Sequence, residues 1–145
     1  ELSRTATSDA SGAPRANLLR YSLAEGQVAI TLTDEAGKID INEAPVELLS
    51  PLLQALVRGT DAFDANNMAQ SIVSTRRTRL YRSLDALFAQ FEITGATARA
   101  MTRALTVHNY TPRIDPRSAP ELVLAAIPGL GAAEAKTLVE RIAHR

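Results

Sequence analysis

Cysteine is absent from the 145-residue sequence, so disulfide bonds and thiolate metal sites are excluded. Tryptophan is also absent and aromatic residues make up only 4%, so any core must be packed mainly by Ala, Leu, Val and Ile. Such a core favours helices, because Ala and Leu lose little conformational freedom in them. No apolar run approaches the roughly 18–20 residues that are needed to span a bilayer.

The sequence also carries no net charge, since 16 basic and 16 acidic residues give a formal charge of zero. This balance argues against a dedicated nucleic-acid binder, whose affinity depends on neutralising phosphates, but it leaves room for a local basic patch. The sequence has no phosphate-binding loop and no nucleophile elbow. His108 and His144 are far apart and lack metal-ligand spacing. We therefore predict that the protein is not an enzyme.

The sequence begins at Glu1 without Met and without a signal peptide, so we expect a processed or trimmed piece of a longer chain. The predicted fold class is α+β and predominantly helical, with two helix-hairpin-helix-like or SAM-like subdomains beside a small antiparallel β-hairpin. Composition and periodicity divide the chain into a flexible lead-in (1–16), a β-hairpin with an edge strand (17–43), a first helical subdomain (44–105), and a short strand with a helix-hairpin-helix (106–145).

The hairpin prediction rests on alternating hydrophobicity. Apolar residues occupy every second position on both sides of the turn at 25–27, namely Leu19, Tyr21, Leu23, Val28, Ile30 and Leu32. Period-two alternation around a glycine-containing turn is typical of a hairpin with one apolar face. After a further turn, Ile39 and Ile41 are expected to add a short edge strand.

One motif occurs twice, and each copy leads into a Leu-rich helical segment. The copies are Lys38-Ile39-Asp40-Ile41-Asn42-Glu43-Ala44-Pro45 and Arg113-Ile114-Asp115-Pro116-Arg117-Ser118-Ala119-Pro120. We expect Ile39 and Ile114 to point into the core. Pro45 and Pro120 are expected at the first helical position, where proline loses no needed N–H. Asn42 and Ser118 are expected to bond backbone groups within the turn.

Asp40 and Asp115 hold the same place in the two copies and allow two interpretations. Carboxylates at repeated positions could be metal ligands, but an aspartate side chain that caps its own turn is the favoured interpretation. No Asp-x-Asp-x-Asp-Gly calcium loop accompanies them. We therefore interpret the motif as a scaffold that leads an extended segment into a helix.

A helix-hairpin-helix is predicted around Pro128-Gly129-Leu130-Gly131, which separates two apolar helical segments. Glycines at Gly129 and Gly131 permit positive φ, and Leu130 can fill the gap between the helices. In nucleic-acid-binding versions, such a turn and the helix after it hold a phosphate. Here Glu134 lies where a phosphate would approach, so a structural hairpin is favoured over DNA binding.

The densest basic cluster consists of Arg76, Arg77, Arg79 and Arg82. One interpretation is contact with nucleic acid or with an acidic partner surface. The other, which we favour, is a solvated helix end whose arginines complement the helix dipole.

Taken in order, several segments resemble the minor pseudopilin K family of type II secretion systems. Asp34–Asn42 is similar to the family's "D-E-x-G-K-hydrophobic-x-hydrophobic-N", Ile72–Arg76 and Tyr81–Leu87 to "I-V-x-W-R … F-x-S-L-D-E-L", and Ile114–Leu130 to "I-N-x-N-T-A-P … L-P-G-L". The sequence departs from the pattern where Thr75 stands for the family's Trp and Asp115 for its Asn. The family's N-terminal hydrophobic helix and C-terminal strands are absent.

The resemblance implies a function in assembly. Members of the family cap a pseudopilus on the periplasmic face of the bacterial inner membrane, together with pseudopilins I and J, and secreted proteins are further candidate partners. Their helical domain is inserted in a pilin-like fold, and a membrane anchor belongs only to the full-length protein. Some members bind calcium, which is the one cofactor implied, and no ligand residues can be assigned to it in this sequence. Nucleic acid is not an expected partner.

The alternative is a periplasmic DNA-binding module of the competence type, whose hairpin domain reads "V-D-I-N-T-A … L-P-G-I-G". This accounts for residues 113–145. It leaves the first copy of the motif, the β-hairpin and the helices between them unexplained.

Overall fold

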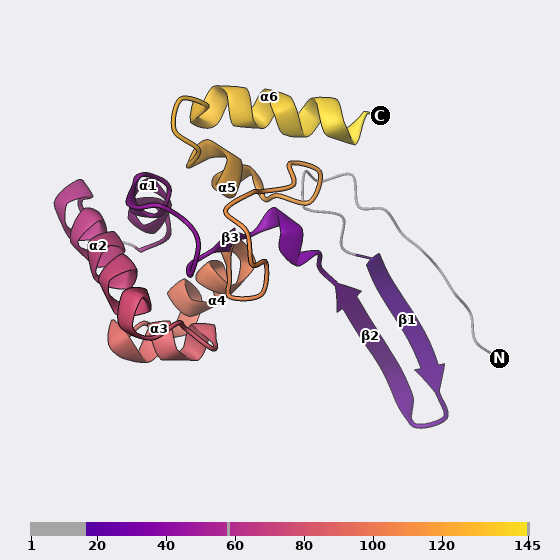
Figure 1. Cartoon of the computed structure of the whole chain (residues 1–145). Coiled ribbons are helices and arrows are strands. Elements are labelled where there is room, and N and C mark those ends of the chain that lie inside the picture. The colour runs from indigo at the N-terminus through magenta and orange to yellow at the C-terminus, as the bar shows by residue number, and fades with distance from the viewer. Residues whose placement is uncertain (1–16, 58, 145) are drawn as a thin grey trace.

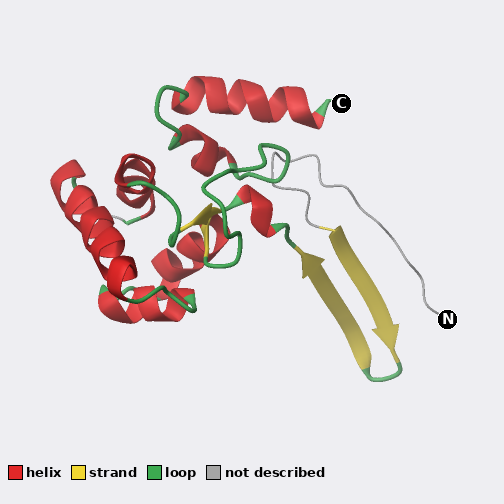
Figure 2. Ribbon diagram, viewed as in Figure 1, coloured by secondary structure: helices red, strands yellow, loops and turns green. Residues whose placement is uncertain are grey.

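The computed structural model describes residues 17–57 and 59–144, so the predicted lead-in at 1–16 lies outside the described residues. The predicted α+β, mainly helical class is confirmed, as Figure 2 shows. The elements are β1 (Asn17–Leu23), β2 (Gly26–Leu32), the 3-10 helix η1 (Glu35–Gly37), β3 (Ile39–Asp40), α1 (Val46–Leu56), α2 (Ala62–Thr78), α3 (Leu84–Gln90), α4 (Gly95–Ala104), β4 (Leu105–Thr106), α5 (Glu121–Ala125) and α6 (Gly131–Ala143).

Strands β1 and β2 form the predicted antiparallel hairpin, which extends away from the helices in Figure 1. Leu19 pairs with Ile30 and Tyr21 with Val28, so the alternating apolar side chains share one face. Every residue of β2 is exposed. The sheet contains only these two strands, and no other described strand pairs with it.

Strand β3 forms as expected, but it is not an edge strand of the hairpin. It pairs in parallel with β4, with Ile39 opposite Leu105 and Asp40 opposite Thr106. The N–H of Ile41 continues the ladder to the carbonyl of Thr106 at 3.0 Å. Ile39, Ile41 and Leu105 are all buried, because the short sheet lies at the centre of the helical body rather than at its margin.

Two helical pairs surround this short sheet. Helices α1 and α2 pack against each other, and so do α5 and α6. The buried residues nevertheless form one cluster that contains Leu49, Leu105 and Val123, and it therefore spans both pairs. Because α1 buries five leucines toward this cluster and α5 buries Val123 and Leu124, the two halves share a core.

The segment just before the first motif copy meets the second copy at Gly37. A Cβ atom placed on Gly37 would lie 2.2 Å from the carbonyl carbon and oxygen of Ser118 and 2.5 Å from the nitrogen of Ala119. One residue away, the N–H of Asp115 donates to the carbonyl of Ala36 at 2.7 Å. The approach of η1 to the second copy therefore requires a residue without a side chain.

The helix starts differ from the prediction by one residue. Pro45 and Pro120 are the N-cap residues, and Val46 and Glu121 are the first helical residues. Both prolines have extended backbones, with ψ of 163° and 147°, because the cap residue has not yet entered the helix. Neither cap makes a side-chain hydrogen bond, so the turn before each proline has to position the helix.

Candidate interaction surfaces and the scaffold that positions them

The turn of the first motif copy is built around Asp40. Its Oδ1 accepts from the N–H of Asn42 at 2.9 Å, and its carbonyl accepts from Glu43 at 3.1 Å and Ala44 at 2.8 Å. The Pro45 carbonyl then accepts the first bonds of α1. The carboxylate thus closes its own turn, as the favoured interpretation predicts.

The second copy repeats this geometry around Asp115. Its Oδ1 accepts from the N–H of Arg117 at 2.9 Å, and its carbonyl accepts from Ser118 at 3.2 Å and Ala119 at 3.0 Å. The carbonyl of Pro120 then accepts the first bonds of α5. The repeat seen in the sequence is therefore a repeat of hydrogen bonds as well.

The two aspartates differ in their second oxygen. Oδ2 of Asp40 accepts from the N–H of Asn109 at 3.0 Å and of Tyr110 at 2.9 Å, so Asp40 also ties β3 to the segment after β4. Asp40 is 2% exposed. Asp115 is less buried, and its second oxygen forms no such bond with another described residue. Within the described residues, no group of carboxylates and histidines has the arrangement of a metal site.

Asn42 and Ser118 do not bond the turn as expected. The side chain of Asn42 instead clamps Tyr81, with Nδ2 donating to the Tyr81 carbonyl and Oδ1 accepting from the Tyr81 N–H, both at 2.9 Å. The Ser118 hydroxyl is buried and has no hydrogen-bond partner among the described residues. The N–H groups of each turn are bonded instead by the carboxylate and the backbone carbonyl of its aspartate.

Arg76 differs from the other arginines of the cluster because its side chain is hydrogen-bonded within the chain. Its Nη1 donates to the carbonyls of Ile41 at 2.9 Å and Ala44 at 2.7 Å, so it holds the first motif turn against α2. Arg76 is half-buried, whereas Arg77, Arg79 and Arg82 are exposed. The prediction of a partner contact therefore concerns these three residues and not Arg76.

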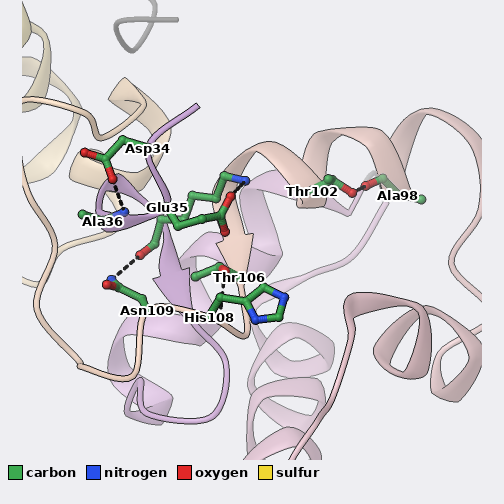
Figure 3. Close-up of polar contacts among 9 residues, drawn as sticks. Asp34, Glu35, Ala36, Ala98, Thr102, Thr106, His108 and Asn109 are labelled. Atoms are coloured by element: carbon green, nitrogen blue, oxygen red, sulfur yellow. Dashed lines mark hydrogen bonds and ion pairs between the residues drawn. The ribbon is translucent and has the colours of Figure 1, made fainter. Parts of the chain in front are cut away.

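An ion pair lies where η1 meets the short sheet. Lys38 is buried and its ammonium donates to Glu35 at 2.5 Å. Thr106 and His108 lie near Glu35 (Figure 3). Burial opposes ionisation of Glu35, but hydrogen bonds to Lys38 and Thr106 and the nearby positive charge outweigh it and lower the pKa of the carboxyl. The ion pair joins η1 to the residue that precedes β3, and the Glu35 side chain remains 40% exposed.

The α5–α6 hairpin has the predicted glycine geometry. Gly129 and Gly131 have φ of 84° and 70°, and Leu130 packs against the core. Pro128 lies in the same turn and is exposed. An Oε2 atom of Glu134 lies 3.1 Å from where a Cβ on Gly131 would be, so the chain's own carboxylate lies at the start of α6. An incoming phosphate would meet that negative charge.

The apolar face of the β1–β2 hairpin is open. Val28 and Ile30 are each 42% exposed, Leu32 is 53% exposed, and Leu23 is 61% exposed. A single two-stranded hairpin is marginally stable unless its apolar face is covered or its edges are paired. This face is consequently a candidate interaction surface of the described residues.

Comparison with known proteins adds no relative. No protein-family model matches the sequence, and neither a curated protein nor a solved structure matches it. None of the described helices is long and apolar enough to cross a bilayer. What these surfaces bind is therefore inferred from their geometry and from the motifs that resemble the pseudopilin K family.

Proposed function

We propose that the chain is part of a non-enzymatic minor pseudopilin of a type II secretion system, which forms the tip of a pseudopilus and supports protein export across the outer membrane. Its partners are then pseudopilins I and J, with secreted proteins as further candidates. Its place is the periplasmic face of the bacterial inner membrane. Calcium is the one cofactor that the resemblance suggests, and no residue of this chain is assigned to it.

The open apolar face of the β1–β2 hairpin is the observation that supports this proposal most directly. Val28, Ile30 and Leu32 are too exposed for a hairpin that functions alone. A pilin-like fold extends such a sheet with further strands and covers its face with a helix. The hairpin therefore fits a subunit that is completed within an assembly.

Co-purification with pseudopilins I and J tests the proposal, and adjacent residues of β2 provide a matched pair of variants. Ile30→Asp places a charge on the apolar face, whereas Thr31→Asp places the same charge on the opposite face. We expect Ile30→Asp to lose the partners and Thr31→Asp to retain them. Equal retention by both variants would show that the face is not used.

DNA binding of the competence type is the second candidate, and the glycine geometry of the α5–α6 hairpin is the observation that favours it. The position of Glu134 beside Gly131 weighs against it. A titration with double-stranded DNA separates the two functions. Micromolar affinity that falls steeply between low and moderate salt, and rises on Glu134→Gln, would favour DNA binding over the tip subunit.

A further inference from the structure

The loop between α2 and α3 presents an unpaired basic surface around one leucine. Arg77, Arg79 and Arg82 are exposed and form no side-chain hydrogen bond or ion pair with another described residue. Leu80 lies among them and is 60% exposed. Asp85, the nearest carboxylate along the chain, is exposed in the first turn of α3 and forms no ion pair with them. The positive charge at this site is left for a partner.

One buried residue lies within the loop. Tyr81 is 6% exposed, whereas Arg79, Leu80 and Arg82 on either side of it are exposed to solvent. The loop therefore anchors itself through Tyr81 and leaves the neighbouring side chains at the surface.

Hydrogen bonds between Tyr81 and the side chains of Asn42 and Gln90 hold the loop in this conformation. Both backbone groups of Tyr81 bond the Asn42 side chain, and its hydroxyl donates to Oε1 of Gln90 at 2.6 Å. Nε2 of Gln90 then donates to hydroxyls of Ser71 and Thr75 on α2. A surface that is already ordered loses less conformational entropy when a partner binds.

We propose that the loop at 79–82, with Arg77 beside it, is a docking surface for an acidic segment of a protein partner. The segment would place an apolar side chain on Leu80 and carboxylates on the flanking guanidinium groups, which pair readily with carboxylates. A protein segment fits better than nucleic acid, because the centre of the surface is apolar and the chain as a whole carries no net charge. The proposal goes beyond the secretion function and holds whether or not pseudopilins I and J bind.

The test is a titration of the isotopically labelled chain with a capped peptide of alternating glutamate and leucine, followed by backbone amide shifts at 0.15 M salt. The shifts are expected at residues 77–82. The double variant Arg79→Glu/Arg82→Glu should weaken binding about tenfold or more, because two attractions become repulsions. Leu80→Ser should weaken it a few-fold.

A matched control reverses the same amount of charge elsewhere. Arg99→Glu/Arg103→Glu alters two exposed arginines of α4 and should weaken binding much less than Arg79→Glu/Arg82→Glu, since neither arginine belongs to the proposed surface. Asn42→Ala should weaken binding although it removes no surface group. If that variant is unfolded, Tyr81→Phe, which removes only the bond to Gln90, tests the same point.

Three results would overturn the proposal. One is equal binding by the wild type and Arg79→Glu/Arg82→Glu. Another is equal binding of a peptide with glutamine in place of glutamate. The third is tighter binding of a double-stranded DNA oligonucleotide than of the acidic peptide at the same loop and salt, which would assign the surface to nucleic acid.

Discussion

Gly37 is the residue at which η1 touches the second motif copy, and the neighbouring atoms of Ser118 and Ala119 are backbone atoms. Gly37→Ala is expected to lower the free energy of unfolding by roughly 3 kcal/mol or more, because Ser118 and Ala119 cannot move aside as a side-chain end could. Gly59→Ala is the control, since Gly59 has φ of 78° and open space around it. It should cost only about 1 kcal/mol of conformational strain. Denaturant unfolding of both variants compares them; similar costs would contradict the contact.

Glu35 gives the structure a defined response to acid. Its pKa is lowered in the folded protein, so the stabilisation it provides is present above the ordinary value of 4.5 and is lost as the pH falls through the folded value. We expect the difference in melting temperature between the wild type and Glu35→Gln to be present at neutral pH and to shrink as the pH falls below 4.5. A difference that grows on acidification would exclude a lowered pKa.

Helices α1 and α5 each begin after a turn that an aspartate closes, and the two copies allow an internal comparison. Asp40 accepts three N–H bonds in a buried place, whereas Asp115 accepts one in a more open place. Asp40→Asn should therefore cost about 2–3 kcal/mol, because a charged acceptor of several N–H groups is lost, and Asp115→Asn about 1 kcal/mol or less. Thermal and denaturant unfolding measure both; a larger cost at Asp115 would refute this ranking.

Local features of the elements were predictable from the sequence. The alternation at 19–23 and 28–32 encodes the hairpin, Gly129 and Gly131 encode the α5–α6 turn, and the repeated Asp encodes the Asx turns. Long-range partners were not predictable. The pairing of β3 with β4 and the clamp of Asn42 on Tyr81 depend on residues that meet only after the helices pack, and no local period specifies them. Leu80 escaped notice because exposure of one leucine leaves no pattern in a sequence.

The whole molecule consists of one shared core and a hairpin outside it. Native-state hydrogen exchange should therefore give similar opening free energies for buried amides of α1 and α5, because Leu49 and Val123 belong to the same cluster. Amides of β1 and β2 should exchange at clearly lower free energies, since every residue of β2 is exposed. Separate opening of α1 and α5 would mean that each helical pair is stable by itself. Binding of a partner to the hairpin should raise the opening free energies of the β1 and β2 amides and leave those of α1 and α5 unchanged.

The repeated turn has a consequence for how this chain can change. Each turn takes its shape from one carboxylate and from backbone groups, so the neighbouring side chains are not needed for it. Asn42 and Arg117 hold equivalent positions in the two copies but differ in what they do. Asn42 bonds a distant loop, whereas Arg117 faces solvent. A motif that depends on so little of its own sequence can acquire a new task at a free position while both helices keep their starting points.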